Sequence, residues 1–439
     1  MKILFGILVF QASFAVTVRS LSPLCASGMT ANINIRSGVE FRPTGNNFDI
    51  TSATASLGWF PKDSLYQTVK GLRIAHYPEN AASPQVMDEN IELYWENPGN
   101  VNVAQFSLDA TVQTASEFVQ VKRKIPFPID QRSLNGDVFS YLQSGKIANQ
   151  NAQILQLAQK LVEGKDDLYH AVYALAEYVS ENIKYSLESE GQPAIQTASA
   201  VIRSKRGKCD EITALFVSLN RAIGIPCRFV SGYSYTENEL FNENWGAHSW
   251  SEVFFPGVGW VPFDVTYGQY GYLDAGHIML SVSVDADSSS VEFGATGVDF
   301  AMQPGYELDT RVDPRRMLPK GDHNQIVDIR LETESGEVGF GSDAVVIATV
   351  RNNRDHYIAT QLELVRAKGV IPLNYDSRIN ILLNPREVIE IPYFFNMDGN
   401  HKPGYSYEYT FSLASKWSTK EPSVNINVKD GAPVFVARQ

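Results

Sequence analysis

The sequence predicts an α+β core that lies between two all-β sandwich domains, and three observations support this prediction. A chain of 439 residues is too long for one ordinary core. Toward both ends of the chain, short apolar and β-branched runs alternate with turn residues, which is typical of sandwiches. In the middle, apolar residues first recur at helical spacing and then with a period of two. Helices followed by antiparallel strands are typical of α+β domains.

The chain begins with the outline of a secretory signal. Lys2 is followed by an almost wholly apolar stretch over residues 3–10 and by small residues up to a cleavage motif that ends at Ala15. We therefore expect residues 1–26 to be a signal peptide, cleaved near Ala26 or after Ala15, and the protein to be secreted or extracytoplasmic, in the cell envelope. The apolar stretch is shorter than the ~20 residues of a spanning helix. An uncleaved N-terminal membrane anchor is the alternative, and no integral membrane domain is expected beyond it.

Residues 27–130 are expected to form the N-terminal β-sandwich. Apolar and β-branched runs such as 91–95 and 118–122 alternate with turn clusters at 43–47 and 97–100. Several short strands between regular turn signals favour two packed sheets.

Residues 131–285 are expected to form the central domain, whose first half is helical. Apolar residues recur at helical spacing over residues 147–162 and again after Asp166 and Asp167, which are the N-cap candidates. A third helix is predicted after Lys208, with Gly224 as its C-terminal stop.

Antiparallel strands are expected after the third helix. Residues 228–235, 248–255 and 260–264 have the period of a strand, and a tight hairpin turn at 256–259 separates the last two. We expect residues 286–322 to be a linker or strand extension. Residues 323–439 are expected to form the C-terminal β-sandwich, of Ig-like type.

Composition and charge exclude several classes of protein. Hydrophobic residues make up 44% of the chain and charged residues 20%, as in soluble globular proteins rather than disordered or fibrous ones. The formal net charge of −12 repels a phosphate backbone, so no nucleic-acid partner is expected.

Only three cysteines occur, so a disulfide framework is not expected. Cys209 opens a predicted helix and Cys227 begins the strand after it. A helix of this length separates its ends by roughly 20 Å, which is too far for a disulfide. Both thiols are therefore predicted to be free.

Cys209 is the candidate nucleophile. It lies at the start of an amphipathic helix and follows Lys205, Arg206 and Lys208. Helix N-terminal amides and nearby cations both favour the thiolate, which is the reactive form. The alternative is a small buried core residue, as free cysteines often are.

His248 and Asp264 are the candidate partners of Cys209. His248 begins one predicted strand and Asp264 ends the next, with the hairpin turn roughly midway between them. Antiparallel strands joined in this way bring the two side chains together. The carboxylate would fix the imidazole tautomer and leave the other ring nitrogen for the cysteine.

Four segments resemble those of a known family. They are Gly-Lys-Cys-Asp-Glu-Ile-Thr-Ala-Leu-Phe at 207–216, Ala-Ile-Gly-Ile-Pro-Cys-Arg-Phe-Val-Ser-Gly-Tyr at 222–233, His-Ser-Trp-Ser-Glu-Val-Phe at 248–254 and Gly-Trp-Val-Pro-Phe-Asp at 259–264. Their order and spacing resemble the transglutaminase-like superfamily over about residues 166–280. His277 and Ile278 are similar to a common bacterial and archaeal continuation.

The resemblance implies a papain-like core with a catalytic triad. Residue by residue, it implies Cys209 as nucleophile, His248 as general base and acid, and Asp264 as the group that orients the histidine. It implies no cofactor and no metal, because no calcium-ligand motif is recognisable. Asp285 and Asp287 are interpreted as solvated loop residues.

Four more residues are candidates for the oxyanion site or the substrate groove. Tyr185 and Gln196 could supply the second oxyanion donor beside the Cys209 amide. The alternatives are a core tyrosine and a capping or solvated glutamine. Trp245 and Trp250 flank the histidine and could wall a groove, although packing within the strand explains them equally well.

The predicted reaction is thiol acyl transfer on peptide or glutamine amides through an acyl-enzyme. An amine acceptor makes the protein a transglutaminase, and water makes it a peptidase or amidase, so the partner is a protein or peptide substrate. Two other classes stay open. One is a catalytically silent surface protein that binds or adheres through its β domains, and the other is a peptide:N-glycanase-like deglycosylating enzyme.

Overall fold

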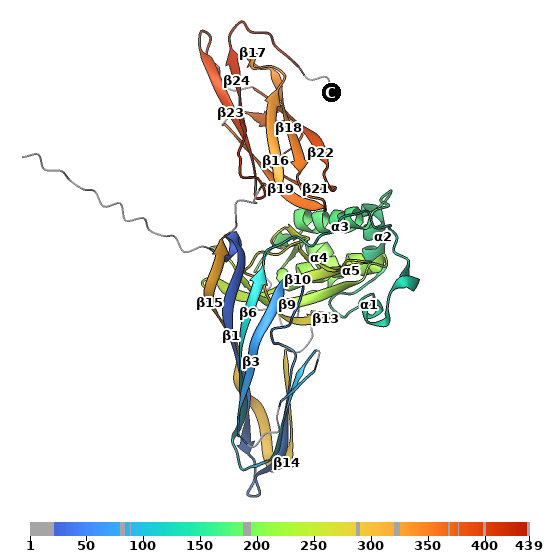
Figure 1. Ribbon diagram of the computed structural model, residues 1–439, viewed down its shortest axis with the longest axis vertical. Helices are drawn as coiled ribbons and strands as arrows, with labels where there is room; N and C mark the ends of the chain where they lie inside the picture. The colour runs from blue at the N-terminus through green and yellow to red at the C-terminus, as the bar shows by residue number, and fades with distance from the viewer. Residues whose placement is uncertain are drawn as a thin grey trace, which may run out of the picture.

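The computed structural model describes residues 22–79, 84–87, 89–187, 195–286, 290–319, 325–367, 369–375, 377–397 and 401–436. These residues form an elongated molecule in which a β-sandwich, a mixed α/β body and a second β-sandwich follow one another along the long axis (Figure 1). The expected signal sequence and its cleavage motif near Ala15 lie outside the described residues.

The N-terminal sandwich has two four-stranded sheets. One sheet has the order β15-β1-β6-β3, and its strands are Phe300–Pro319, Ala26–Pro43, Val103–Ala115 and Gln67–Tyr77. The other has the order β14-β2-β5-β4, with Val291–Val298, Asp49–Leu57, Ile91–Gly99 and Gln85–Val86. Their facing side chains, including Trp95, Phe41 and Phe106, form one buried core.

Of the two alternatives expected over residues 286–322, a linker or a strand extension, these pairings show strands where the segment is described. β15 runs antiparallel to β1 from Ala26↔Pro319 to Pro43↔Phe300, and β14 runs antiparallel to β2. Leu308 and Val312 face the sandwich core. Three charged residues give this part of the sequence the appearance of a loop. They are exposed on β15, and they are Asp313, Arg315 and Arg316.

Two boundaries of the N-terminal unit also differ from expectation. Ala26 is fully buried as the first residue of β1, and Pro23 in the short helix η1, Pro23–Cys25, is buried as well. The structure therefore includes Pro23 and Ala26 in this unit, a few residues before the expected start at residue 27. Residues 118–122 form no strand, because Phe118 leaves the sandwich and packs against Tyr272 and Trp417.

The central body has a five-stranded sheet of order β12-β11-β10-β9-β13. Its strands are Gln269–Tyr270, Gly259–Asp264, Trp245–Phe255, Cys227–Tyr235 and Ile278–Ser283. The helices are α1 Gly136–Ser140, α2 Ala152–Leu161, α3 Leu168–Asn182, α4 Ala198–Ser204 and α5 Cys209–Ala222, and a small parallel pair joins β7 Lys184–Tyr185 to β8 Arg206–Gly207. The result is the expected papain-like α+β core, with α5 buried between the other helices and the sheet.

The three helices predicted from apolar spacing are confirmed. Asp167 accepts a hydrogen bond from the amide of Tyr169 and caps α3, and α5 begins directly after Lys208. The first helix begins later than predicted, because Asn151 caps α2 through the amide of Ile154.

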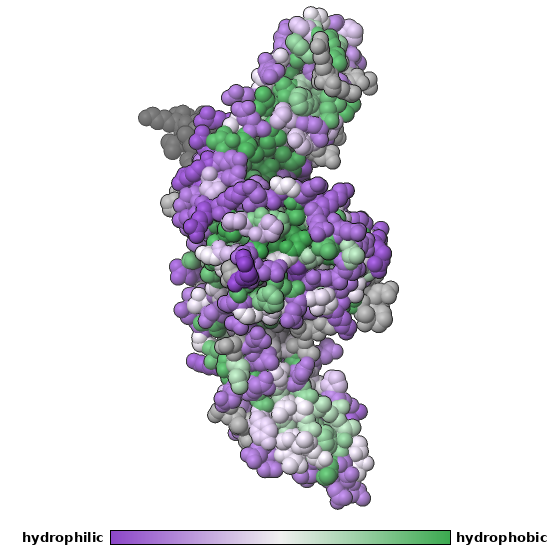
Figure 2. Space-filling view, turned by 90° about the vertical axis from the view of Figure 1, so that its right-hand side faces the viewer, coloured by the Kyte–Doolittle hydropathy of each residue, from purple (hydrophilic) through white to green (hydrophobic). Residues whose placement is uncertain are grey.

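The C-terminal sandwich packs a four-stranded sheet on a five-stranded one. The first has the order β16-β18-β22-β20, with Val327–Thr333, Asp343–Asn352, Val388–Asn396 and Ile371–Pro372. The second has the order β17-β24-β23-β19-β21, with Glu337–Val338, Ser423–Lys429, Ser406–Ser415, Ile358–Arg366 and Arg378–Leu383. Apolar side chains gather on the face of this sandwich in Figure 2.

The C-terminal sandwich is anchored on α3. The Tyr357 hydroxyl donates to the buried Asp167 carboxylate, and His170 is hydrogen-bonded to Asn384 at 2.8 Å. The Tyr357 ring also stacks on Tyr169 of α3, with ring centroids 4.9 Å apart. Among the helices that the structure describes, none has the length and apolarity needed to span a membrane.

Candidate active site

The start of α5 places Cys209 at the edge of the helix core. Glu211, which is fully buried, accepts hydrogen bonds from the backbone amide of Lys208 at 3.0 Å and from both the amide and side chain of Gln196. This carboxylate satisfies one of the amides that a helix start leaves without an intrahelical partner, and it fixes where the helix begins. Cys209 is thereby held as the first helical residue, with its side chain partly exposed.

The three cysteines have different environments, as expected of free thiols. Cys227 is buried, and its burial raises the pKa of that thiol to about 12. Cys25 is exposed at the start of the N-terminal sandwich. Of the three, Cys209 is the one that lines a cavity together with a histidine.

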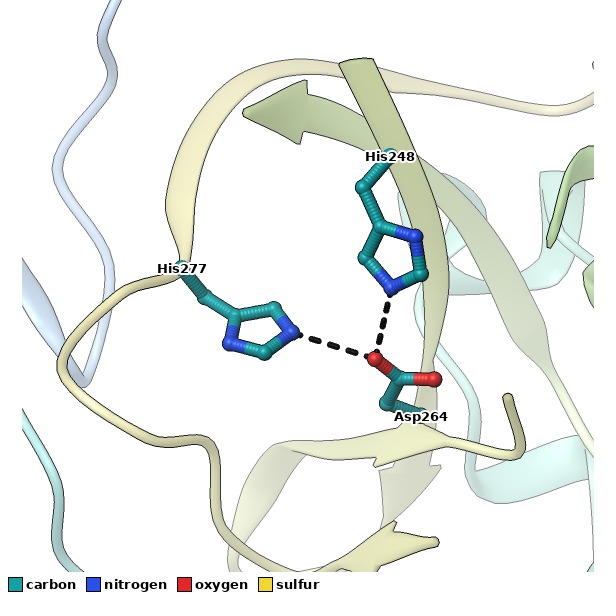
Figure 3. A group of neighbouring side chains, drawn as sticks. All are labelled: His248, Asp264 and His277. Atoms are coloured by element: carbon teal, nitrogen blue, oxygen red, sulfur yellow. Dashed lines mark hydrogen bonds and ion pairs between the residues drawn. The ribbon is translucent and has the colours of Figure 1, made fainter. Parts of the chain in front are cut away.

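The β10–β11 hairpin brings His248 and Asp264 together as predicted. The strands pair from Phe255↔Gly259 to Ser251↔Phe263, so Asp264 lies one residue and His248 three residues past the last pair, on opposite strands. His248 Nε2 lies 2.7 Å from Asp264 Oδ2, and both side chains are buried (Figure 3). Thr213 of α5 donates to the carbonyl of Ser249 at 3.0 Å, which ties the cysteine helix to the histidine strand.

The second ring nitrogen of His248 is left for Cys209. With Nε2 committed to Asp264, Nδ1 is the nitrogen that can meet the thiol. Burial alone would lower the pKa of His248, but the charge and hydrogen bond of Asp264, together with the hydrogen bond to Cys209, hold it well above its usual value. This geometry favours an imidazolium beside Cys209.

Asp264 is fully buried and accepts four hydrogen bonds. The amides of Thr266 and Tyr267 donate to Oδ1 at 2.8 and 2.9 Å, and the two histidines His248 and His277 approach Oδ2 at 2.7 and 3.1 Å. Burial disfavours the charged carboxylate, but these donors outweigh it and hold the pKa of Asp264 well below its usual range. Asp264 is therefore a fixed, ionised acceptor.

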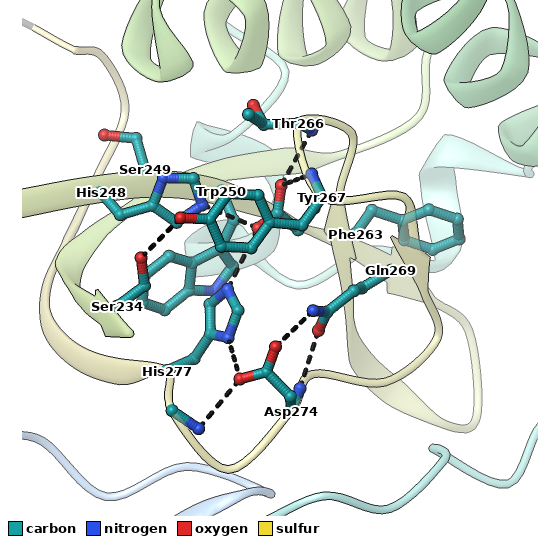
Figure 4. A network of polar contacts seen from close by, with 12 residues as sticks. Ser234, His248, Ser249, Trp250, Phe263, Thr266, Tyr267, Gln269, Asp274 and His277 are labelled. Carbon is teal, nitrogen blue, oxygen red and sulfur yellow. Dashed lines mark hydrogen bonds and ion pairs between the residues drawn. The ribbon is translucent and has the colours of Figure 1, made fainter. Parts of the chain in front are cut away.

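A second histidine behind Asp264 was noted in the sequence only through its resemblance. His277 Nδ1 lies 3.0 Å from Asp274 Oδ1. The side-chain amide of Gln269 donates to Asp274 Oδ2, and the backbone amide of Asp274 donates to the Gln269 side-chain oxygen (Figure 4). The approach of β13 is close, since a Cβ at Gly232, opposite His248 in the register, would lie 2.0 Å from the Ile278 carbonyl oxygen. Gln269, Asp274 and His277 are joined by local hydrogen bonds, and the sheet order brings this group beside His248.

The trio His248, Asp264 and His277 has ligand atoms within 4.8 Å of one another, as a metal site would. Both Nε2 atoms nevertheless point at one carboxylate oxygen, which occupies the position that an ion between them would need (Figure 3). A zinc ion requires its ligand atoms at about 2.0–2.2 Å around a shared centre. The donor arrangement fits a hydrogen-bond network and does not fit a metal.

A cavity of about 220 Å³ opens over Cys209 and His248. Tyr185, predicted from the sequence, is among its walls, and the loop between β9 and β10 contributes Leu240 and Phe241. The Phe241 ring meets Tyr185 edge-on at 6.3 Å. The cavity thus has an apolar part at Leu240 and Phe241, and polar side chains such as Asn238 and Glu243 also line it.

Tyr267 is a cavity residue that the sequence reasoning missed. Its ring stacks on the His248 imidazole with centroids 4.4 Å apart and planes 14° from parallel, and its hydroxyl is 3.2 Å from Ser234 (Figure 4). Its place directly after the aspartate segment is the one signal that could have found it. The ring covers the His248–Asp264 pair on the cavity side.

Three other expected groove residues lie elsewhere. Gln196 holds Glu211 and does not line the cavity, because its amide side chain is used to cap the helix region. Trp250 is fully buried and donates to the Tyr66 hydroxyl at 3.2 Å, so it supports the site from behind. Trp245 packs against Tyr235 at the N-terminal core.

Asp285 is not the solvated loop residue expected from the sequence, and Asp287 lies outside the described residues. It is nearly buried and accepts hydrogen bonds from the amides of Ile147 and Ala148, both at 2.8 Å. Its carboxylate therefore anchors the segment that precedes α2.

Comparisons with known proteins concern the central body. The profile of the Transglutaminase-like superfamily matches residues 155–265. YebA, an uncharacterised protein of Bacillus subtilis, is 34% identical over 129 residues, which cover 26% of this chain and 18% of that protein. A protein-glutamine gamma-glutamyltransferase of Pseudomonas aeruginosa is 28% identical over 123 residues, which cover 27% of this chain and 18% of the relative. The chain thus spans about a fifth of the length of the curated relatives it matches.

A crystal structure of a candidate cysteine protease from Cytophaga hutchinsonii covers 66% of this chain and 93% of its own, with 17% identity and a TM-score of 0.47. That likeness is too low to bear on function. The profile match falls on the segment that carries Cys209, His248 and Asp264 in the order and spacing described above. Residues 155–265 are therefore a core of the transglutaminase-like superfamily.

Proposed function

We propose that this protein is an extracytoplasmic thiol acyl-transfer enzyme, with Cys209 as nucleophile, His248 as general base and acid, and Asp264 as the group that orients the histidine. The observation that carries the proposal is the buried 2.7 Å contact between His248 and Asp264, behind a partly exposed helix-start thiol in the same cavity. A cysteine needs such an arrangement to attack an amide.

In the proposed reaction, the Cys209 sulfur attacks the carbonyl carbon of a peptide or glutamine amide. The C–N bond breaks, the leaving amine takes the proton from His248 Nδ1, and an S-acyl enzyme remains. An acceptor then gives a proton to His248 and attacks the thioester, which releases the thiolate. Asp264 keeps Nε2 protonated throughout, so that Nδ1 alone exchanges protons.

The negative charge that develops on the carbonyl oxygen during the attack must be stabilised by hydrogen-bond donors. The backbone amide of Cys209 is suited to this role, because the first amides of a helix have no intrahelical acceptor. Tyr185 lines the same cavity and is the candidate for the second donor. The apolar wall of Leu240 and Phe241 favours the aliphatic part of a substrate side chain.

The test is incubation of the purified protein with casein and a fluorescent amine. We expect amine incorporation if the acceptor is an amine and casein fragments or released ammonia if it is water. Cys209→Ala should abolish either product. Cys25→Ala is the matched control, because it removes an exposed thiol outside the cavity. Equal product from the wild type and Cys209→Ala would contradict the proposal.

A catalytically silent binding protein is the competing function. It would have no use for an activated thiol, so the rate at which iodoacetamide labels Cys209 at mildly acidic pH separates the two. Labelling of Cys209 that is no faster than labelling of buried Cys227 would favour the silent protein.

A further inference from the structure

We propose that His277 is a permanently charged imidazolium that positions Asp264 and sets the electrostatic field at His248. This role rests on the proposed function and goes beyond the three residues that perform it. His277 is fully buried and uses neither ring nitrogen for substrate. It acts through Asp264 and is therefore a positioning residue.

The first argument is the hydrogen bonding of the ring. His277 Nδ1 faces Asp274 Oδ1 at 3.0 Å, and Nε2 faces Asp264 Oδ2 at 3.1 Å. A neutral imidazole has one N–H and one lone pair, so one nitrogen would direct its lone pair at a carboxylate oxygen. Two carboxylate acceptors are satisfied only if both nitrogens carry protons.

The second argument is that both carboxylates accept several hydrogen bonds, which stabilise their ionised forms. Both oxygens of Asp264 accept hydrogen bonds, Oδ1 from two backbone amides and Oδ2 from His248 and His277. Asp274 accepts from the Gly276 amide and His277 at Oδ1, and from Gln269 at Oδ2. The proton shared by this group therefore lies on His277.

The directions of the pKa shifts agree with this geometry. Burial by itself would lower the pKa of His277, but Asp274 and Asp264 outweigh it and hold it above the usual value. Burial would raise the pKa of Asp274, but His277 and Gln269 hold it below its usual range.

The third argument concerns the electrostatic effect of the His277 charge on His248. The His248 and His277 rings are 5.6 Å apart, and the other rings around His277 are the uncharged Trp250 and Tyr267, at 5.2 and 5.6 Å. Lys416 of the C-terminal sandwich is a further cation that acts on Asp274. The positive charge of His277 thus offsets part of the pull of two buried carboxylates on the proton of His248.

The test uses two variants that change the charge in opposite directions. His277→Gln removes the cation, so His248 holds its proton more strongly and the basic limb of the kcat/KM profile should move to higher pH. Asp274→Asn removes an anion, so the same limb should move to lower pH. Charges at this separation predict shifts on the order of one pH unit. His170→Gln, outside this network, is the matched control and should leave the limb in place.

A structural defect would not produce opposite shifts. Unshifted limbs, or limbs that move in the same direction in both variants, would overturn the proposal. His277→Asn tests the same charge loss in a smaller side chain, in case the glutamine variant does not fold.

A second measurement requires no turnover and leaves His277 and Asp274 unchanged. Nitrogen-15 NMR of histidine-labelled Cys209→Ala protein should give two protonated ring nitrogens for His277 at pH 8, and a neutral tautomer there would overturn the proposal. An inactive wild type with a charged His277 would instead contradict the proposed function and leave this inference standing.

Discussion

Replacing Asp264 by asparagine exchanges one carboxylate oxygen for an amide nitrogen at a point where four donors converge. The amide oxygen can still accept from the backbone of Thr266 and Tyr267. Its nitrogen then faces the N–H groups of His248 and His277, and donor meets donor. The variant therefore loses both the charge and the acceptor that hold His248 in place.

The size of the effect follows from the contact distance. Unit charges 2.7 Å apart attract each other by roughly 6 kcal/mol at an effective dielectric constant of about 20. Without the charge and hydrogen bond of Asp264, burial dominates and the pKa of His248 should fall from its raised value. A triad aspartate changed to asparagine typically costs about 10⁴ in kcat.

The assay is kcat on a fluorogenic peptide amide from pH 5 to 9, together with urea unfolding of both proteins. Removing one partner of a buried charge pair should lower the free energy of unfolding by about 3–5 kcal/mol. The pKa of His248 is raised in the folded state, so its contribution is complete below about pH 6.5 and is lost as pH rises through the raised value. The pKa of Asp264 is depressed, so its contribution is complete above about pH 4 and is lost as the solution is acidified.

The stability difference between the wild type and Asp264→Asn should therefore be largest between about pH 4 and 6.5. The reasoning would be refuted by a loss in kcat smaller than tenfold in a variant that unfolds like the wild type. It would equally be refuted by a stability difference that grows as pH rises above 7.

Three further outcomes are expected. Iodoacetamide should label Cys209 at pH 6 at least ~10²-fold faster than Cys227, because the buried thiol has a pKa of about 12; mass spectrometry of tryptic peptides measures both rates, and equal rates would count against an activated thiolate. Glu211→Ala should lower the free energy of unfolding by about 2–3 kcal/mol, because three buried or half-buried donors lose their acceptor; an unchanged midpoint in urea would contradict this. Tyr267→Ala should lower kcat/KM and expose His248 to water, whereas Tyr267→Phe, which keeps the stacked ring, should retain most of the activity; equal losses in both would assign the effect to the hydroxyl.

Local patterns in the sequence determined much of this fold. The apolar spacing predicts the helices that became α3 and α5, because one face of each helix must be buried whatever it packs against. The hairpin turn predicts that His248 and Asp264 meet, because two strands joined by a tight turn have only a few registers. The helix start predicts an unusual environment for Cys209, since helix capping depends on a few neighbouring residues.

Contacts between distant segments could not be predicted in this way. β15 follows the whole central body in sequence and yet pairs with β1. Its charged outer face resembles a linker, because only the buried side of such a strand shows regularly spaced apolar residues. Gln196 and Trp250 were candidates for the site, with capping and packing as the alternatives, and their contacts fit the alternatives: Gln196 holds Glu211 and Trp250 supports His248 from behind. Composition and spacing say which residue types are near the site and leave open the direction in which each side chain points.

The sequence by itself determined the three residues of the candidate triad and the α+β core that carries them, because each depends on a helix start or a hairpin. Only the tertiary structure decided what surrounds them. The sheet order places β13 beside β9, and with it the His277–Asp274 pair behind Asp264. The charge balance around His248 depends on the distances and directions among Asp264, Asp274 and His277, which sequence spacing does not fix, and for that reason the folded arrangement was needed to reveal it.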